Sequence, residues 1–158
     1  MYTMKFMKYW PLFCLILVAA LAAFAMAPTL EMRHWMHYFM GFFLCQFAML
    51  KLFKTALFVE GFQKYDLIAM KSSLYAHLYP FIELALGLGY LSFFVPVLVY
   101  IVTIVVLGIG AVGVVQALFK GLDVRCACMG TVLDVPLSTV TLTEDLVMVI
   151  MAATLLLK

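Results

Sequence analysis

Charged residues are scarce in this chain. Of its 158 residues, 68% are hydrophobic and only 11% are charged. An ordinary soluble domain is roughly half apolar and about a quarter charged, so water cannot be the solvent for most of this surface. The composition therefore predicts an integral membrane protein that is surrounded by the lipid bilayer.

Several functional signatures are also missing. The net charge is only +2, and no block of like charges occurs, which argues against nucleic acid as a partner. The sequence has no glycine-rich phosphate loop, no His-Glu-x-x-His, no Gly-x-Ser-x-Gly and no dinucleotide fingerprint. Its four cysteines are too few for a disulfide framework. No hydrolase or transferase site is predicted.

Long apolar runs are abundant. A membrane-spanning helix needs about 20 mostly apolar residues, and only a closed helical bundle or barrel satisfies its backbone in lipid. We expect an all-α membrane protein with five spans: Tyr9–Leu30, about Met36–Thr55, about His77–Phe94, about Val97–Phe119 and a fifth that ends at Leu157. The third and fourth form a tight hairpin that breaks near Pro96.

The first span has a second interpretation. Lys5 and Lys8 precede an apolar run, and Ala23-Phe24-Ala25 offers a small-residue cleavage site, as in a signal peptide. We favour an uncleaved helix. The predicted organisation is an N-terminal hydrophobic segment with an outer loop over 1–35, followed by a four-helix membrane domain over 36–158.

The segment Leu57–Lys71 places Phe58, Phe62, Tyr65 and Ala69 on one side of a helical wheel. This pattern favours a helix that lies in the membrane interface, although an ordinary loop with scattered aromatic residues would also fit.

Basic residues indicate the orientation, because cytoplasmic loops retain Lys and Arg. One side of the predicted topology carries Lys5, Lys8, Lys64, Lys71, Lys120 and Arg125, whereas the other carries Arg33 and Lys158. We therefore predict a multi-pass protein of the bacterial inner membrane, with the N-terminus and the loop over 120–136 in the cytoplasm.

Ionisable side chains gather at that same side. Lys51 lies roughly 6 Å from the end of its span and Glu83 roughly 9 Å into the next, so the two can pair. Glu144 and Asp145 enter the fifth span from the same side. Alternatively, Glu83 after Pro80 and Glu144 after Thr143 only complement helix N-terminal dipoles.

The loop over 120–136 carries Cys126 and Cys128, two thiols in a Cys-x-Cys pair. Arg125 favours their thiolate form and Asp123 opposes it weakly. Thiolates exchange disulfides, or they bind a soft metal such as Cu(I) or Hg(II), for which Met129 is a third ligand. The pair can also be two incidental small residues in a turn.

His34 and His37 stand beside Trp35 in a methionine-rich stretch, which would fit an outward-facing soft-metal port. Such residues at a helix mouth are more often interface anchors.

Five stretches together resemble a known family. They are Phe47-Ala48-Met49-Leu50-Lys51-Leu52-Phe53, Gly61-Phe62, Tyr65-Asp66, Tyr79-Pro80-Phe81-Ile82-Glu83-Leu84 with Gly87, and Cys126-Ala127-Cys128-Met129-Gly130. Over about Met36–Ala153 the chain is similar to the MauE branch of the DoxX-like membrane proteins.

The resemblance implies a DoxX-like four-helix membrane core with a thiol-redox association. In methylamine-oxidising bacteria, MauE is linked to maturation or export of a disulfide-rich dehydrogenase subunit, and related families occur alongside heavy-metal-binding domains. The positions that match the family pattern are Lys51, Tyr65, Asp66, Glu83, Cys126 and Cys128.

Three functions are consistent with this reading. The first is a protein that assists maturation of, or electron transfer to, a periplasmic redox partner, with Cys126 and Cys128 as the exchanging thiols and no cofactor. The second is soft-metal transport or delivery through Cys126, Cys128 and Met129. The third is a structural subunit of a membrane complex. In the first, the predicted pocket is formed by Lys51, Glu83, Tyr65, Asp66, Glu144 and Asp145.

Overall fold

The computed structural model describes residues 2–29, 31–122 and 139–157. Over these ranges the chain forms helices and no strand. In chain order they are α1 (Tyr2–Met26), α2 (Met32–Phe53), α3 (Thr55–Phe62), α4 (Ser73–Ser92), α5 (Pro96–Phe119) and α6 (Thr139–Leu157).

Several of the helices are long enough to span a membrane. Tyr9–Met26 of α1, all of α2 and all of α5 are long and apolar enough to cross a bilayer. Helices α4 and α6 contain 20 and 19 residues. At 1.5 Å per residue they measure about 30 Å, close to the thickness of the hydrocarbon core. The prediction of an all-α membrane protein is confirmed, although hydropathy alone identifies three of the five expected spans in the described ranges.

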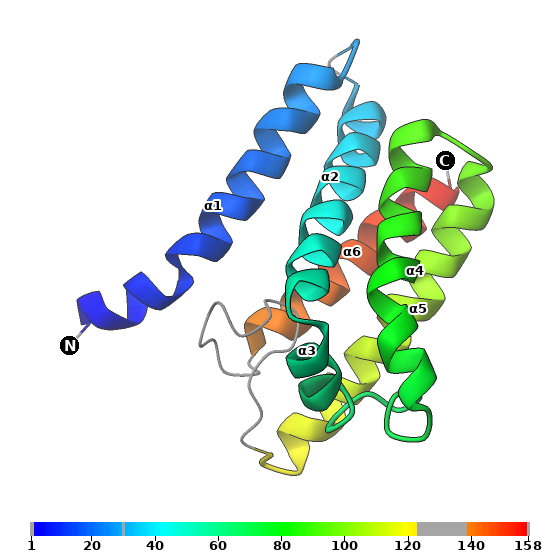
Figure 1. Cartoon of the computed structure of the whole chain (residues 1–158). Helices are drawn as coiled ribbons and strands as arrows, with labels where there is room; N and C mark the ends of the chain where they lie inside the picture. Colours follow the sequence, from blue (N-terminus) through cyan, green and yellow to red (C-terminus); the bar gives the residue numbers. More distant parts are fainter. Residues whose placement is uncertain (1, 30, 123–138, 158) are drawn as a thin grey trace.

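Four of the helices form a bundle (Figure 1). Helix α2 packs mainly against α4, and α5 packs against α6. The two pairs meet where α4 contacts α5 and α2 contacts α6. Helix α1 leans against α2 outside this bundle. The expected four-helix arrangement with an additional N-terminal helix is therefore what the structure has.

The hairpin between α4 and α5 breaks where the sequence predicts. Phe93 and Val95 adopt positive φ angles of 52° and 41°, which end the helical path of α4. Pro96 begins α5, where its missing N–H costs no hydrogen bond.

The interface helix expected over Leu57–Lys71 is shorter than predicted. Helix α3 ends at Phe62, and the chain continues in turns up to Ser72, which caps α4 through its side chain. The expected aromatic face exists, but it does not point at lipid. Phe58, Phe62, Tyr65 and Ala69 are buried together with Tyr79 of α4 and with Val114 and Ala117 of α5.

Candidate functional site

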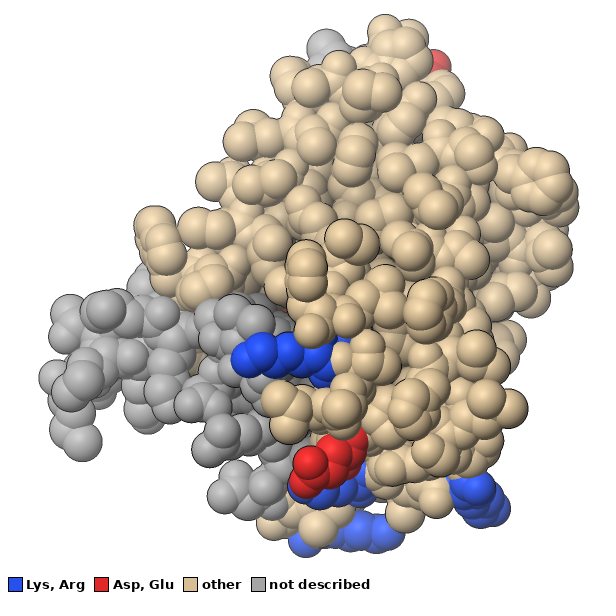
Figure 2. Space-filling view, viewed as in Figure 1, with Lys and Arg blue, Asp and Glu red and all other residues tan. Residues whose placement is uncertain are grey.

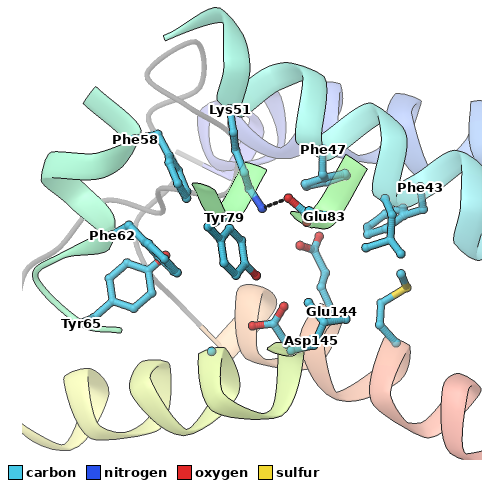
Figure 3. A pocket seen from close by; sticks show the side chains of 14 residues that line it. Phe43, Phe47, Lys51, Phe58, Phe62, Tyr65, Tyr79, Glu83, Glu144 and Asp145 are labelled. Atoms are coloured by element: carbon cyan, nitrogen blue, oxygen red, sulfur yellow. Dashed lines mark hydrogen bonds and ion pairs between the residues drawn. The ribbon is translucent and has the colours of Figure 1, made fainter. Parts of the chain in front are cut away.

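A small cavity lies between the helices at the end of the bundle that carries α3 (Figure 3). The centre of a water molecule can occupy about 30 Å³ of it. All helices except α1 contribute to its wall, together with the link after α3. The lining residues are Phe43, Leu44, Phe47, Lys51, Phe58, Phe62, Tyr65, Tyr79, Glu83, Leu107, Gly110, Glu144, Asp145 and Met148.

Lys51 and Glu83 form a buried ion pair across this cavity. Nζ of Lys51 on α2 lies 2.5 Å from Oε2 of Glu83 on α4, and the two residues are only 3% and 5% exposed. The same ammonium lies 4.9 Å from the ring centre of Tyr79 and 5.6 Å from that of Phe58. A charge inside the membrane needs such partners, and the structure brings the two predicted residues together.

Glu144 and Asp145 line the cavity from α6, on the side facing the ion pair (Figure 3). A β-carbon on Gly110 of α5 would lie 3.9 Å from Oδ2 of Asp145, in ordinary van der Waals contact, so the Asp145 carboxyl lies close to α5 at this position. Among the described lining residues, three carboxyl groups therefore share the cavity with one ammonium group.

The helix-dipole interpretation of these acids is wrong. Helix α4 begins at Ser73 and α6 at Thr139, and neither helix has an acidic residue in its first turn. Glu83 and Glu144 thus lie beyond the free N–H groups that a dipole interaction requires. Pro136, expected in the first turn of the last span, lies outside the described residues.

Tyr65 and Asp66 are neighbours in sequence but differ in role. Tyr65 lines the cavity, whereas Asp66 does not and is fully buried beside it. Oδ1 of Asp66 accepts hydrogen bonds from the backbone N–H groups of Ile68 and Ala69 at 3.0 and 2.9 Å. Burial raises the pKa of this carboxyl above its usual range, and the two N–H groups oppose the rise. Asp66, predicted as a pocket residue, thus lies outside the cavity lining and holds the turn between α3 and α4.

Tyr79 and Phe58 are cavity residues that the sequence analysis did not assign to the predicted pocket. Tyr79 precedes Glu83 by one helical turn, so both face the same way from α4, and this spacing could have identified Tyr79. Phe58 was expected only on the aromatic face of an interface helix, because its ring reaches Lys51 through the packing of α3 against α4.

The predicted thiols Cys126 and Cys128, with Met129, lie outside the described residues. The helices on either side of the segment that carries them, α5 and α6, are described. Helix α5 runs past the cavity at Gly110 before it ends at Phe119, and α6 starts at Thr139 shortly before it reaches Glu144. Both ends of that segment therefore belong to the cavity end of the bundle.

Exposed lysines gather at this end. On the face shown in Figure 2, basic side chains lie toward the lower end and most of the remaining surface is neutral. Lys54, Lys64, Lys71 and Lys120 are all exposed there or nearby. Lys54 is the residue between α2 and α3, where it has access to the interface, as a lysine near a helix end does.

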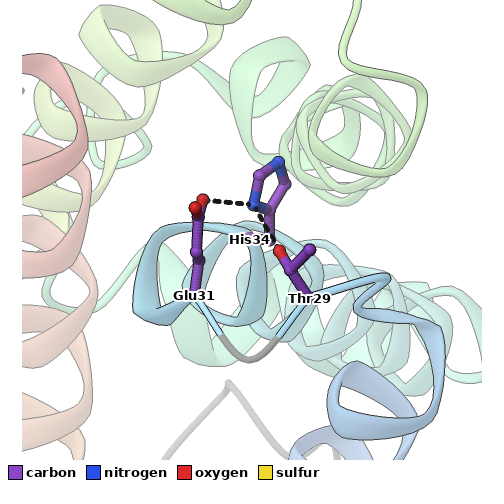
Figure 4. Close-up of polar contacts among 3 residues, drawn as sticks. All are labelled: Thr29, Glu31 and His34. Carbon is purple, nitrogen blue, oxygen red and sulfur yellow. Dashed lines mark hydrogen bonds and ion pairs between the residues drawn. The ribbon is translucent and has the colours of Figure 1, made fainter.

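His34 and His37 lie near the start of α2, at the end of the bundle away from the cavity, and the Nδ1 atom of each ring has a protein partner. His34 Nδ1 lies 3.2 Å from Glu31 and 3.5 Å from the hydroxyl of Thr29 (Figure 4). His37 is buried instead, and its Nδ1 bonds to the carbonyl oxygen of Tyr90 at 2.8 Å. Within the part of the chain that the structure describes, no group of three His, Cys, Asp or Glu residues could hold a metal ion.

Comparison with known families decides the identity. The family described as "Methylamine utilisation protein MauE" matches residues 7–158 of this chain. The chain belongs to the MauE family. It is thus a MauE-like membrane protein of methylamine utilisation, and the resemblance inferred from its motifs is confirmed. The match starts at residue 7, so the family pattern includes α1, which the resemblance had left out. Searches of curated proteins and of solved structures found no match.

Proposed function

We propose that this MauE-family protein exchanges thiols and disulfides with a partner redox protein, and that Cys126 and Cys128 are the exchanging groups. The main support is the place of the thiol-bearing segment along the chain. The segment with both thiols leaves α5 and enters α6 at the end of the bundle where the charged cavity lies. An intramembrane group of ionisable residues is costly to maintain, so its position at the end of the bundle from which the thiol-bearing segment departs favours a shared function.

The exchange balances as follows. The thiolate of one cysteine attacks a disulfide of the partner, forming a mixed disulfide and releasing one partner thiolate. The second cysteine then attacks the mixed disulfide, which closes the Cys126–Cys128 disulfide and releases the other partner thiolate. Two electrons pass to the partner, and the protons lost by the two cysteines are taken up by the partner thiolates. The reverse sequence oxidises the partner, and a second dithiol or disulfide protein restores the pair.

The cavity residues support this role by positioning. Glu144 and Asp145 line the cavity near the start of α6, which packs against α5, while the Lys51–Glu83 pair joins α2 to α4. The two ends of the thiol segment are thereby fixed to a rigid bundle. Partner recognition would take place at the surface of that end, where the lysines lie.

Cysteine trapping tests the proposal. In a background with Cys14→Ser and Cys45→Ser, the single variants Cys126→Ser and Cys128→Ser each lack one half of the pair, so a mixed disulfide can form but cannot be resolved. Rapid acid quenching of cells followed by non-reducing electrophoresis should show a reductant-sensitive adduct for one of the two. The double variant is the control and should show none. If neither single variant forms an adduct, the exchange function is wrong.

A further inference from the structure

Three exposed lysines at the cavity end of the bundle have no ion-pair partner among the described residues. They are Lys54 between α2 and α3, Lys71 just before α4, and Lys120 at the end of α5. Of the exposed lysines that the structure describes, only Lys64 forms an ion pair, with Glu60. Because α2 and α5 end here and α4 begins here, the three unpaired ammonium groups share one end of the bundle (Figure 1).

Each of these lysines directly follows a large apolar residue that is itself exposed. The apolar residues are Phe53, Met70 and Phe119, and they are 74%, 58% and 89% exposed. At the edge of a bilayer, an apolar side chain contacts the acyl chains while a neighbouring lysine extends its ammonium group to the headgroups. An apolar residue followed by a lysine at all three positions therefore fits the boundary between acyl chains and headgroups.

The surface of this end has an excess of positive charge. Its described part exposes a single acid, Glu60, which is already paired with Lys64. The other described acids of this end line the cavity or are buried. At the opposite end one exposed acid, Glu31, is matched by one exposed base, Arg33. The unpaired lysines therefore create a positive field at one membrane surface only, within the part of the chain that the structure describes.

We propose that Lys54, Lys71 and Lys120 bind the headgroups of anionic phospholipids of the phosphatidylglycerol type, while the apolar residue before each lysine lies among the acyl chains. An ammonium group offers three N–H donors, and a headgroup phosphate supplies acceptor oxygens and a negative charge. A zwitterionic headgroup carries its own cation beside the phosphate, so it competes poorly. This lipid site goes beyond the thiol exchange proposed above and does not depend on it.

Electron spin resonance of the unmodified full chain in phosphatidylcholine bilayers tests the proposal. A trace of spin-labelled phosphatidylglycerol or spin-labelled phosphatidylcholine reports the fraction of each lipid that the protein surface holds. We expect the association constant of phosphatidylglycerol to be at least about threefold higher at low salt. Raising sodium chloride from about 0.01 M to about 1 M should bring the ratio close to one, because salt screens exposed charges. Equal association of both lipids at low salt would overturn the proposal and favour an acidic protein surface as the partner of the lysines.

Free phosphate is distinguished from lipid in the same bilayers. Sodium phosphate in place of sodium chloride at equal ionic strength should leave the lipid ratio unchanged. Displacement of the labelled phosphatidylglycerol by phosphate would mean that the lysines form a site for the free ion, and the lipid assignment would be wrong.

Variants then locate the lipid site. The triple variant Lys54→Gln/Lys71→Gln/Lys120→Gln should bring the lipid ratio close to one, and its thermal stability should match the parent because the three side chains are exposed and unpaired. Glu60→Gln/Lys64→Gln is the matched control, since it removes an exposed charge pair at the same end without changing the net charge. The control should keep the parent ratio. A triple variant that keeps that ratio, or a control that loses it, would contradict the assignment.

Discussion

A β-carbon on Gly87 of α4 would lie 2.7 Å from Sγ of Cys45 on α2. It would also lie 3.0 Å from the carbonyl oxygen of Gly41, one turn earlier on α2. Real β-carbons essentially never approach other atoms so closely, so α2 and α4 pack at this distance only because Gly87 has no side chain. Small residues serve this purpose in membrane helices. The same two helices carry Lys51 and Glu83, so this contact also sets the geometry of the ion pair.

Gly87→Ala should therefore destabilise the protein, by about 1–3 kcal/mol, because overpacking pushes α2 and α4 apart. Gly108→Ala is the control. A β-carbon at Gly108 on α5 meets nothing within 4 Å, so that variant should be neutral or slightly more stable through its higher helix propensity. Thermal unfolding in one detergent compares the two. Equal stability of both variants would show that the close approach is not needed.

Breaking the buried ion pair should be costly. Lys51→Met leaves Glu83 as a buried charge that has lost its ion-pair partner and should cost about 3–5 kcal/mol, and Glu83→Leu removes the carboxylate nearest the Lys51 ammonium and should also destabilise the protein. The double variant removes both charges and should cost less than the sum of the single variants. A double-mutant cycle from unfolding free energies measures this coupling.

The exposed pair Lys64–Glu60 provides the comparison for that cycle. Its Nζ and Oε1 atoms lie 3.4 Å apart, but the side chains are 55% and 69% exposed. Surface pairs contribute within about 1 kcal/mol, so its cycle should give a coupling close to zero. A coupling of the same size for both pairs would mean that burial is not the cause.

Asp66 should make stability depend on pH. Burial raises the pKa of its carboxyl, so the folded protein holds the proton more tightly than the unfolded chain. The stabilisation from this group is complete below its ordinary pKa and is lost as the pH rises through the raised value. Asp66→Asn keeps an oxygen acceptor and carries no charge, so it should flatten the pH profile above pH 4 or so.

Asp66→Ala separates the charge from the hydrogen bonds. It leaves the N–H groups of Ile68 and Ala69 without their acceptor and should cost about 1–3 kcal/mol at acid pH, where the parent carboxyl carries no charge. Unfolding curves from acid to neutral pH distinguish the two variants. A profile for Asp66→Asn that matches the parent would show that another group controls the pH dependence.

Much of the fold follows from the sequence because lipid permits few alternatives. Uncharged runs predict the helices, and the depths of Lys51 and Glu83 predict that they meet. The limits of single elements are less accessible. Helix α3 ends at Phe62, and the side chain of Asp66 then caps a separate turn. The spacing of apolar residues along the sequence does not predict this turn.

The sequence predicts the charged part of the site, because its ionisable residues lie near the same end of their spans. Glu144 and Asp145 were expected there from the entry of the last span, and both line the cavity. Tyr65 and Asp66 look equivalent in sequence, yet the packing of Tyr65 against α5 sends one side chain into the cavity and the other into the turn. Gly113 shows the closeness of that packing, since a β-carbon there would lie 2.6 Å from the carbonyl oxygen of Tyr65.

The side of the membrane on which Cys126 and Cys128 lie decides which thiol chemistry is feasible. Positive residues favour a cytoplasmic location for the end with α3, and hence for Cys126 and Cys128. In a Cys14→Ser/Cys45→Ser background, a membrane-impermeant maleimide should label these thiols only after the cells are opened. Arg33→Cys, added to a Cys126→Ser/Cys128→Ser version of the same background, is the control, because Arg33 is exposed at the opposite end, near the α1–α2 connection, and should be labelled in intact cells. If Cys126 and Cys128 are labelled from outside, the protein has the opposite orientation to the one predicted from its basic residues.

The thiols would then face an oxidising compartment, where a stable disulfide persists and a partner can be oxidised directly. Labelling from inside instead requires that reducing equivalents cross the membrane to reach a periplasmic partner.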